Sequence, residues 1–371
     1  MMAILTINVG SSSLRMAVYA VPDGRALAMA HLETNTGHGD AAALLQNFVA
    51  EARVGGIEAI CHRIVHGGAH VTQFTRLDER VKAAINESAP LAPLHNPPAL
   101  AWIDAASKAF PEAEQFAAFD TGLYAGLPDV AAHYAVPHDV SVRRLGFHGL
   151  AHQAMLHYLQ ALAPQDFAGK RVISLQLGSG CSATASVNGC ALDTSMGYTP
   201  LEGLMMGTRS GDIDPGLLIH WAKDLGKSIE DIEALLTAKS GLLGVSGISS
   251  DMRELMAADD PRARLAVDMF CYRVRKYIGA YVAALGGLDA VLIGGGIGEN
   301  MPAIRARILQ PLGCFGIQLD EGLNDRAVGT TGPISQKDSP VGVHVVVVDE
   351  NALMAQDTLK HLAAGNEGGQ S

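Results

Sequence analysis

A strand–turn–strand pattern that occurs twice constrains the fold of this chain more than any other feature. The apolar stretch Ile4–Val9 leads into Gly10 and three serines, and a second apolar stretch follows. Residues 173–177 lead in the same way into Gly178 and the sequence Ser-Gly-Cys-Ser, followed by another apolar stretch. The two turns start 168 residues apart. A repeat at half of the chain length predicts two related lobes rather than a solenoid.

Composition limits the class of protein and the partners it binds. Of the 371 residues, 48% are apolar and 18% are charged, which is typical of a globular protein, and the length favours two domains. The net charge of −11 argues against nucleic acid as the main partner. The five cysteines include no Cys-x-x-Cys pair, which indicates reduced thiols in the cytoplasm. No apolar run approaches ~18 residues and no basic start or cleavage site follows Met1, so we expect a cytoplasmic protein without a signal peptide or membrane span.

Hydrophobic periodicity predicts a chain of strands and helices. Asn96 resembles a helix cap, and Pro97 and Pro98 favour the first helical turn that follows it. Strands are expected within 3–9, 14–20, 55–68, 114–122 and 170–189, and helices at 96–110, 149–163, 215–225, 228–239, 261–285 and 302–310. Residues 288–300 are expected to be a strand that runs into a glycine cluster, and residues 341–363 a strand and a closing helix.

Three glycine-rich turns each follow a predicted strand, at 10–13, 178–182 and 294–298. Backbone N–H groups in such turns form nests that bind anions. The two related hairpins could hold a phosphate chain, and the third turn could take the sugar and base of a nucleotide. Actin and hexokinase use this layout, but from these residues alone a generic α/β enzyme stays equally open.

Several other motifs do not meet their structural requirements. A Walker loop ending at "GKS" needs glycine at position 221, which is Trp221, and a dinucleotide fingerprint over "GGGIGEN" needs its third glycine at Glu299. His62, His66 and His70 have the spacing of a helical metal site, but two glycines after His66 and a strand-like run before it argue against a helix.

The long polar segment "DTSMGYTPLEGLMMGTRSGDIDPG" at 193–216 resembles the acetate kinase family closely. The same resemblance extends, in order along the chain from residue 8 to 357, to "NVGSSSL", "HRIVHGG", "LAPLHNP", "FDTG", "RRLGFHGLAH", "GGIGEN" and "DENALMAQD". The matches cover nearly the whole chain.

The resemblance implies an α/β protein with a two-lobed, duplicated fold of the actin/hexokinase (ribonuclease H-like) type and an active site in the interdomain cleft. The lobes would be residues 1–147 with 352–371, and residues 148–351. The implied reaction is reversible, in-line transfer of the ATP γ-phosphoryl to acetate with Mg²⁺ (or Mn²⁺), giving acetyl phosphate and ADP. The family also implies a homodimer, for which the apolar helix at 261–285 could serve.

The implied chemistry assigns roles to the matched residues. A carboxylate is ionised at pH 7, since free acids have pKa values near ~4, so it needs positioning and positive charge rather than a general base. Arg63 and Arg209 match the guanidinium groups that hold the carboxylate and the transferring phosphoryl group. His148 matches a further donor to that group, and Asp120 matches an acid that holds an arginine or the metal in place.

Further residues match the binding sites of the family. The metal site corresponds to Asn8 and Glu350, and the acyl pocket to Val65, Leu94, Phe147 and Pro200. The nucleotide site corresponds to Ser11, Ser12, Ser13, Gln176, Gly178, Ser179, Gly180, Asp251, Met252, Arg253, Gly296, Ile297, Gly298 and Asn300.

The chain departs from the family pattern at two places. Gln176 and Ser179 stand where the family usually has His and Asn, and Gly122-Leu123-Tyr124 replaces Ala-Phe-His. These changes leave the phosphoryl donor and the rate open. Propionate or another short-chain carboxylate is the alternative acceptor, and a nucleotide-binding sensor or scaffold without catalysis is the remote alternative. Dependence of ATP turnover on added acetate separates these readings.

Overall fold

The computed structural model describes residues 1–10, 13–33, 40–68, 71–93, 95–137, 139–140 and 142–368, and the side chains up to residue 364. The predicted site residues Ser11, Ser12 and Leu94 lie outside these ranges. The chain forms two compact units, one of Met1–Ala125 with Asp349–Ser371 and one of Gly126–Val348. No helix in the described part of the chain is both long and apolar enough to cross a bilayer.

The first unit is built on a six-stranded sheet in the order β3-β2-β1-β4-β6-β5. Strand β1 pairs antiparallel with β2 and parallel with β4, β4 is parallel to β6, and β3 and β5 add antiparallel edges. The strands are β1 (Met2–Val9), β2 (Ser13–Ala20), β3 (Ala26–Glu33), β4 (Gly56–Ile64), β5 (Thr75–Arg76) and β6 (Glu114–Phe119).

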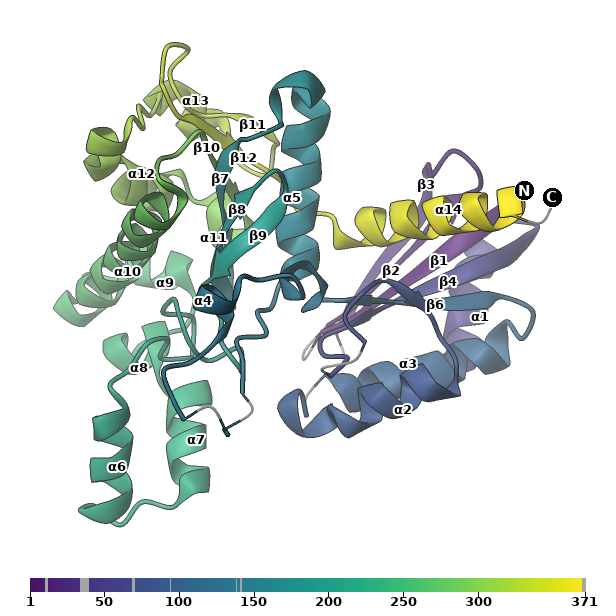
Figure 1. Cartoon of the computed structure of the whole chain (residues 1–371), viewed down its shortest axis with the longest axis horizontal. Helices are drawn as coiled ribbons and strands as arrows, with labels where there is room; N and C mark the ends of the chain where they lie inside the picture. The colour runs from purple at the N-terminus through teal and green to yellow at the C-terminus, as the bar shows by residue number, and fades with distance from the viewer. Residues whose placement is uncertain are drawn as a thin grey trace. The chain divides into compact units, whose positions relative to one another are not determined.

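Helices cover both faces of this sheet, which agrees with the nearly continuous burial of β1, because successive side chains of a strand point to opposite faces. Leu5 and Ile7 of β1 share a buried cluster with Leu45 and Trp102 of the helices on one face. Tyr19 of β2 points to the opposite face, which α14 covers (Figure 1). The helices are α1 (Ala41–Glu51), α2 (Glu79–Glu87), α3 (Asn96–Ala109) and α14 (Glu350–Gly368), with short 3-10 turns η1 (Ala89–Leu91) and η2 (Gly122–Tyr124).

The second unit repeats this plan with a sheet in the order β11-β12-β10-β7-β8-β9. Strand β7 is antiparallel to β8 and parallel to β10, and β10 is parallel to β12. The strands are β7 (Arg171–Leu177), β8 (Cys181–Val187), β9 (Cys190–Thr194), β10 (Ala290–Gly294), β11 (Gly332–Pro333) and β12 (Gly342–Val345).

Helices α5 and α10 pack on the two faces of this second sheet (Figure 1). The helices of the unit are α4 (Asp129–Ala132), α5 (Gly149–Leu162), α6 (Pro215–Lys223), α7 (Ile229–Ala238), α8 (Gly241–Ser246), α9 (Met252–Ala257), α10 (Pro261–Leu285), α11 (Gly295–Asn300), α12 (Pro302–Leu309) and α13 (Glu321–Arg326), with 3-10 turns η3 (Pro164–Asp166) and η4 (Gln310–Phe315).

The predicted duplication is confirmed at the level of the two hairpins. Strands β1 and β2 pair as far as Val9 and Leu14, and β7 and β8 pair as far as Leu177 and Cys181. Gly10 N donates to Ser13 O at 2.7 Å in the first turn, and Gly178 N donates to Gly180 O at 3.1 Å in the second. Each turn joins the central parallel strand of its unit to the neighbouring antiparallel strand.

The boundaries of the units differ from the predicted lobes. Residues 126–147 belong to the second unit because their polar groups bond within it: Leu145 N and Gly146 N both donate to Gly197 O. The chain returns to the first unit at Asp349, so Glu350 lies in the first unit rather than in the predicted 148–351 lobe. Asp349 Oδ1 accepts from Ala352 N, a bond that holds the first turn of α14 at the residue where the chain returns to the first unit.

Two local predictions are wrong. Residues 295–300 form the short helix α11 rather than a turn, because Gly295 adopts a positive φ of 79° at the strand end and Glu299 Oε1 accepts from its N–H at 2.8 Å. Asn96 is the first helical residue of α3 and makes no cap. Its buried amide instead donates to His66 O and Ile85 O, which fixes the chain between β4 and α2.

Candidate active site

Arg63 and Asp120 meet at the carboxyl ends of two parallel strands in the first unit. Arg63 pairs in register with Ala118, two residues before Asp120, and Asp120 N donates to Ile64 O at 2.9 Å. Arg63 Nε donates to Asp120 Oδ1 at 3.1 Å and Nη2 donates to Oδ2 at 2.6 Å. The Asp120 side chain is 1% exposed, so this two-bond fork is buried and holds the guanidinium in one plane.

Asn8 and Glu350 complete this cluster on the other side of Arg63. Arg63 Nη1 donates to Asn8 Oδ1 at 3.3 Å, and Asn8 Nδ2 donates to Glu350 Oε2 at 2.7 Å. Burial would lower the pKa of Arg63, but the carboxylates of Asp120 and Glu350 more than offset it and raise that pKa. Arg63 therefore stays charged beside two acids, with a side chain that is 13% exposed.

The oxygen atoms of this cluster suit a hard divalent cation. Glu350 and Asn8 provide a carboxylate and an amide oxygen, the donor types that Mg²⁺ and Ca²⁺ prefer. Among the described residues, no group of three or more His, Cys, Asp or Glu side chains is arranged around a metal position. A few protein oxygens without a closed cage fit Mg²⁺, which usually keeps water and phosphate ligands.

Arg209 lies in the second unit without an acidic partner. Its Nη1 donates to Pro200 O at 2.7 Å, and no carboxylate of the described residues lies within ion-pair distance of it. Burial lowers the pKa of Arg209, since no acid compensates for the lost water. A half-buried guanidinium with spare donors and no counter-ion is suited to an incoming anion.

His148 stands beside Arg209 at the start of α5. Its backbone is left-handed, with φ 60° and ψ 24°, and its Nδ1 lies 2.9 Å from Ser182 Oγ. A Cβ built on Gly180 would lie 3.2 Å from both His148 Nε2 and Arg209 Nη2. The second glycine turn thus approaches both side chains as closely as its backbone allows, and no larger residue fits at 180 without moving them.

A chain of hydrogen bonds behind His148 was not foreseen. His152 Nε2 lies 2.7 Å from Ser182 Oγ, and His152 Nδ1 lies 2.7 Å from Ser174 Oγ. Burial, with a smaller contribution from His148, lowers the pKa of His152 well below its usual value, so His152 is neutral. The motif "HGLAH" contains both histidines, but only the fold shows that Ser182 joins them.

The predicted phosphate residues gather around the second turn. Gly207 N donates to Ser179 O at 3.1 Å, and a Cβ on Gly178 would lie 3.7 Å from Gly296 N of α11. Gln176 Oε1 is buried and has no hydrogen-bond partner among the described residues. Such a polar atom calls for a ligand or water.

The predicted adenosine residues lie at two helix starts. On α11, Asn300 Nδ2 donates to Gly296 O at 3.0 Å, and Gly298 is buried beside Ile297. On α9, Asp251 caps the helix and pairs with Arg253, which lowers the pKa of Asp251 to about 2, and Met252 is buried. Gly207 lies between the start of α9 and the glycine turn at 178–180, since a Cβ on Gly207 would lie 3.5 Å from both Ser179 O and Ser250.

The predicted acyl-pocket residues are divided between the units. Val65 is buried in the first unit, one residue beyond the end of β4. Phe147 is buried in the second unit, next to His148. Pro200, the Arg209 acceptor, is half-buried in the same unit.

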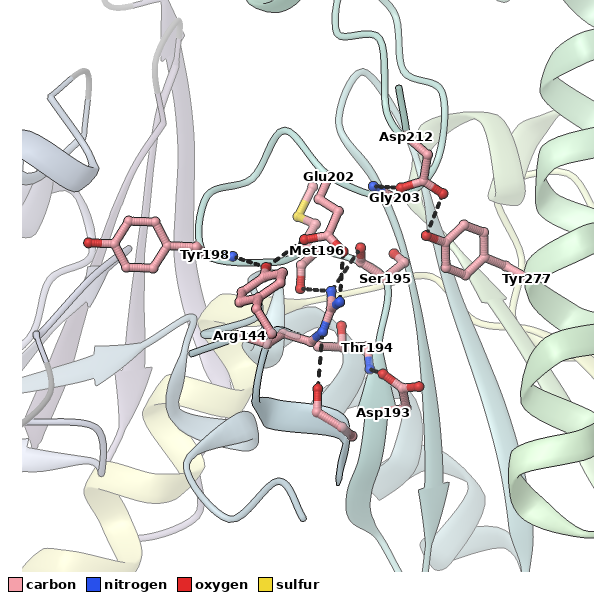
Figure 2. Close-up of polar contacts among 12 residues, drawn as sticks. Arg144, Asp193, Thr194, Ser195, Met196, Tyr198, Glu202, Gly203, Asp212 and Tyr277 are labelled. Carbon is pink, nitrogen blue, oxygen red and sulfur yellow. Dashed lines mark hydrogen bonds and ion pairs between the residues drawn. The ribbon is translucent and has the colours of Figure 1, made fainter. Parts of the chain in front are cut away.

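A second polar network, which had no predicted role, holds the segment that contains Pro200, the residue whose carbonyl accepts from Arg209. Arg144 Nη2 donates to Glu202 Oε1 at 2.7 Å, and Figure 2 shows these two side chains beside the segment that carries Met196 and Tyr198. Both residues fall in the family-like motifs at 143–152 and 193–216. The motifs marked them, but nothing in the spacing showed that they pair.

Known proteins are similar to this chain in sequence and in fold. A sequence profile of the Acetokinase family matches residues 30–356. The chain is 42% identical to a protein named acetate kinase from Pseudomonas aeruginosa strain LESB58, over 96% of this chain and 98% of that protein. It is similar to the crystal structure of Porphyromonas gingivalis acetate kinase, with a TM-score of 0.88, 35% identity and 98% and 100% of the two chains covered. It is also similar to the crystal structure of a propionate kinase from Francisella tularensis subsp. tularensis SCHU S4, with a TM-score of 0.87, 34% identity and coverage of 96% and 99%.

Proposed function

This chain belongs to the acetokinase family, and on that premise we propose that it transfers the γ-phosphoryl group of ATP to acetate, reversibly, giving acetyl phosphate and ADP. The single observation that carries the proposal is Arg209. It is a half-buried cation without an acidic partner among the described residues, and it lies beside His148 at a glycine-rich turn. That combination suits a phosphoryl group in transfer, which spreads negative charge over its oxygens.

The reaction needs no proton acceptor. Acetate is ionised at pH 7, since free carboxylic acids have pKa values near ~4. One of its oxygens forms a bond to the γ-phosphorus while the bond from phosphorus to the bridging oxygen breaks, and the electron pair leaves with ADP. The obstacle is the approach of an anion to a polyanion, so placed positive charge and hydrogen-bond donors supply the catalysis.

The side chains of the two units divide this work. We assign Arg63 to the acetate carboxylate, with its plane fixed by Asp120, and Arg209 to the transferring phosphoryl group. His148 donates a further hydrogen bond to that group. Asp120 acts by holding Arg63, because both of its oxygens already accept from that guanidinium.

A divalent cation is the expected cofactor. Asn8 and Glu350 would hold Mg²⁺ or Mn²⁺ in the first unit, and the cation would neutralise phosphate charge when bound. The glycine turn at 178–180 and the start of α11 would hold ATP or ADP through backbone N–H groups. Homodimer formation and a cytoplasmic location remain predictions, the first of them open to a measurement of mass in solution.

The acceptor is proposed to be acetate ahead of propionate. Of the residues predicted to form the acyl pocket, the structure describes Val65 in the first unit and Phe147 and Pro200 in the second, and each is buried or half-buried. The solved structure of a propionate kinase at 34% identity keeps the longer acid as the second candidate. A tight apolar pocket distinguishes one methylene by roughly 1–3 kcal/mol.

The test is ATP turnover by the purified chain, with and without acetate, followed as acyl hydroxamate. We expect turnover that requires acetate and that falls by orders of magnitude in Arg209→Ala while ADP still binds, since one lost donor to transition-state charge costs roughly 3–4 kcal/mol. Acetate-independent nucleotide binding without turnover would support a sensor or scaffold instead. Near-normal turnover in Arg209→Ala would contradict the role of Arg209.

A further inference from the structure

The segment 196–203 carries the carbonyl group that holds Arg209. Pro200 O accepts from Arg209 Nη1 at 2.7 Å, and this is the only hydrogen bond of that guanidinium to a described residue. The segment contains no helix or strand. Backbone hydrogen bonds reach it at Gly197, whose O accepts from Leu145 N and Gly146 N, and at Gly203, whose O accepts from Asp212 N. Between these two points the direction of the Pro200 carbonyl depends on the side chains that hold the segment.

Two side chains from the stretch 126–147 hold one side of this segment. Arg144 Nη2 donates to Glu202 Oε1 at 2.7 Å and Nη1 donates to Met196 O at 3.2 Å (Figure 2). Tyr134 OH donates to Glu202 Oε2 at 2.6 Å and accepts from Tyr198 N at 2.8 Å. Both carboxylate oxygens of Glu202 are therefore used, and the contacts flank Pro200 on both sides in the sequence.

This cluster of Tyr134, Arg144 and Glu202 is compact and half-buried, with the Glu202 side chain 33% exposed. The Arg144 side chain is 17% exposed, and its guanidinium lies 5.5 Å above the Tyr134 ring. A Cβ on Gly197 would overlap Glu202 and the Tyr134 hydroxyl, so the segment passes as close to the cluster as a glycine permits. Bonds of this charge-assisted kind are stronger than neutral ones.

A separate contact fixes the far end of the segment. Gly203 N donates to Asp212 Oδ1 at 2.8 Å, and Tyr277 OH of α10 donates to Asp212 Oδ2 at 2.8 Å (Figure 2). The segment is therefore anchored at its end by Asp212 and along its length by the cluster. Pro200 lies in the part that the cluster holds.

We propose that Tyr134, Arg144 and Glu202 are positioning residues for Arg209, acting through the carbonyl of Pro200. The cluster touches neither acetate nor nucleotide in this assignment; it sets the direction of the one acceptor that orients the Arg209 guanidinium. The inference rests on the proposed function, which places Arg209 at the transferring phosphoryl group. Positioning of this kind matters because a displacement of about 1 Å at a catalytic group can cost ~100-fold in rate.

The test is a double-mutant cycle on acetate-dependent turnover. Tyr134→Phe removes one hydroxyl that holds both Glu202 and Tyr198 N, and Glu202→Gln removes the charge that holds Arg144. Each should lower kcat by roughly 10- to 100-fold, with KM for ATP changed by less than about twofold. In the Arg209→Ala background the same substitutions should change kcat by less than about twofold, because the group that they position is gone.

Tyr158→Phe is the matched control, since Tyr158 OH lies 3.2 Å from His344 Nδ1 in the same unit and away from the segment. It should leave kcat unchanged in both backgrounds. Equal losses from Tyr134→Phe with and without Arg209 would overturn the proposal, because they would show a general structural role. If Glu202→Gln does not fold, the cycle is measured with Tyr134→Phe and Arg209→Ala alone. Absence of acetate-dependent turnover in the unaltered chain would instead contradict the proposed function, and with it the placement of Arg209 on which this inference rests.

Discussion

The Asp120 carboxylate accepts from both Nε and Nη2 of Arg63, so a buried acid fixes the plane of the guanidinium. Arg209 has no such partner among the described residues. The two arginines therefore differ: two hydrogen bonds to a carboxylate fix and neutralise the Arg63 guanidinium, whereas the Arg209 guanidinium has no described acid to offset its charge. The difference fits an acceptor site that orients a substrate and a transfer site that stabilises developing charge.

Replacing Asp120 with Asn should disorient Arg63 without emptying the nucleotide site. The amide offers one acceptor oxygen in place of two and no charge, so the fork is lost. We expect kcat to fall by about 100- to 1,000-fold, with a higher KM for acetate and unchanged ADP affinity. Asp289→Asn is the control, because Asp289 forms a similar fork with Arg171 Nε and Nη2. An equal loss in both variants would mean that the Arg63 fork has no special part in turnover.

Replacing Ser182 with Ala should release the orientation of His148. Ser182 Oγ joins His148 Nδ1 to the buried His152, and removal of a buried partner also costs about 1–3 kcal/mol of stability. We expect kcat to fall by roughly tenfold with ADP affinity kept, less than the ~100-fold that a displacement of about 1 Å can cost, because His148 stays in place and loses only the hydroxyl that orients its ring. Ser186→Ala on the same strand is the control, since the one partner of Ser186 Oγ among the described residues is Val172 O, at 3.4 Å. Unaltered kcat in Ser182→Ala would show that His148 needs no fixed orientation.

Restoring the usual family residues at 176 and 179 tests the departures near the phosphates. Gln176 Oε1 is buried without a partner among the described residues, so replacing this side chain breaks no hydrogen bond that the structure describes. We expect the double variant Gln176→His, Ser179→Asn to have ATP-dependent activity equal to or above that of the unaltered chain, and neither protein to use pyrophosphate. A gain of ATP use accompanied by a loss of pyrophosphate use would show that the departures mark a different donor.

Shortening Val65 tests the acyl pocket. Val65→Ala should raise the ratio of kcat/KM for propionate to that for acetate by about tenfold, since a tight pocket rejects one methylene by roughly 1–3 kcal/mol. The control is Val49→Ala in α1, where the side chain is as buried as Val65 but packs in the helix-covered core. Steady-state kinetics with both acids give the ratio. An unchanged ratio would remove Val65 from the pocket, and a preference of the unaltered chain for propionate would change the proposed acceptor.

The sequence predicted the parts of the molecule that local patterns determine. The hairpin turns at Gly10 and Gly178 follow from glycine and serine between apolar runs, and the order of the family motifs placed Arg63, Asp120 and Glu350 in one site. It did not predict partners far apart in the chain. Arg144 and Glu202 are 58 residues apart, and only the paths of two irregular segments bring them together.

Local rules also failed where tertiary contacts were stronger. Asn96 is a residue type that often caps helices, yet its side-chain amide donates to the carbonyl groups of His66 and Ile85 instead. The glycine cluster after β10 became a helix because Glu299 bonds back to Gly295 N and to Val348 N, a contact made by a residue beyond the cluster. Hydrophobic periodicity does not predict which distant backbone group a long side chain will contact.

Acid should destabilise the first unit through His62. The side chain is buried in β4, its Nε2 lies 2.8 Å from Gln115 Oε1, and burial lowers its pKa to about 4. The pKa of an unfolded histidine is near ~6.5, so between these values the unfolded state binds more protons than the folded state. Stability is then complete above pH ~6.5 and is lost as the pH falls toward 4, by about 2 kcal/mol between pH 7 and pH 5.

The measurement is urea unfolding at pH 7 and pH 5 in a Trp221→Phe background, where Trp102 of α3 is the only tryptophan and reports the first unit. His62→Gln should be less stable at pH 7 and should lose less stability on acidification than its parent, by about the same 2 kcal/mol. His31→Gln, an exposed position in β3 of the same unit, should match the parent at both pH values. An identical pH dependence in His62→Gln and the parent would mean that other groups cause the acid sensitivity. His66, whose pKa burial also lowers, would be the next residue to replace.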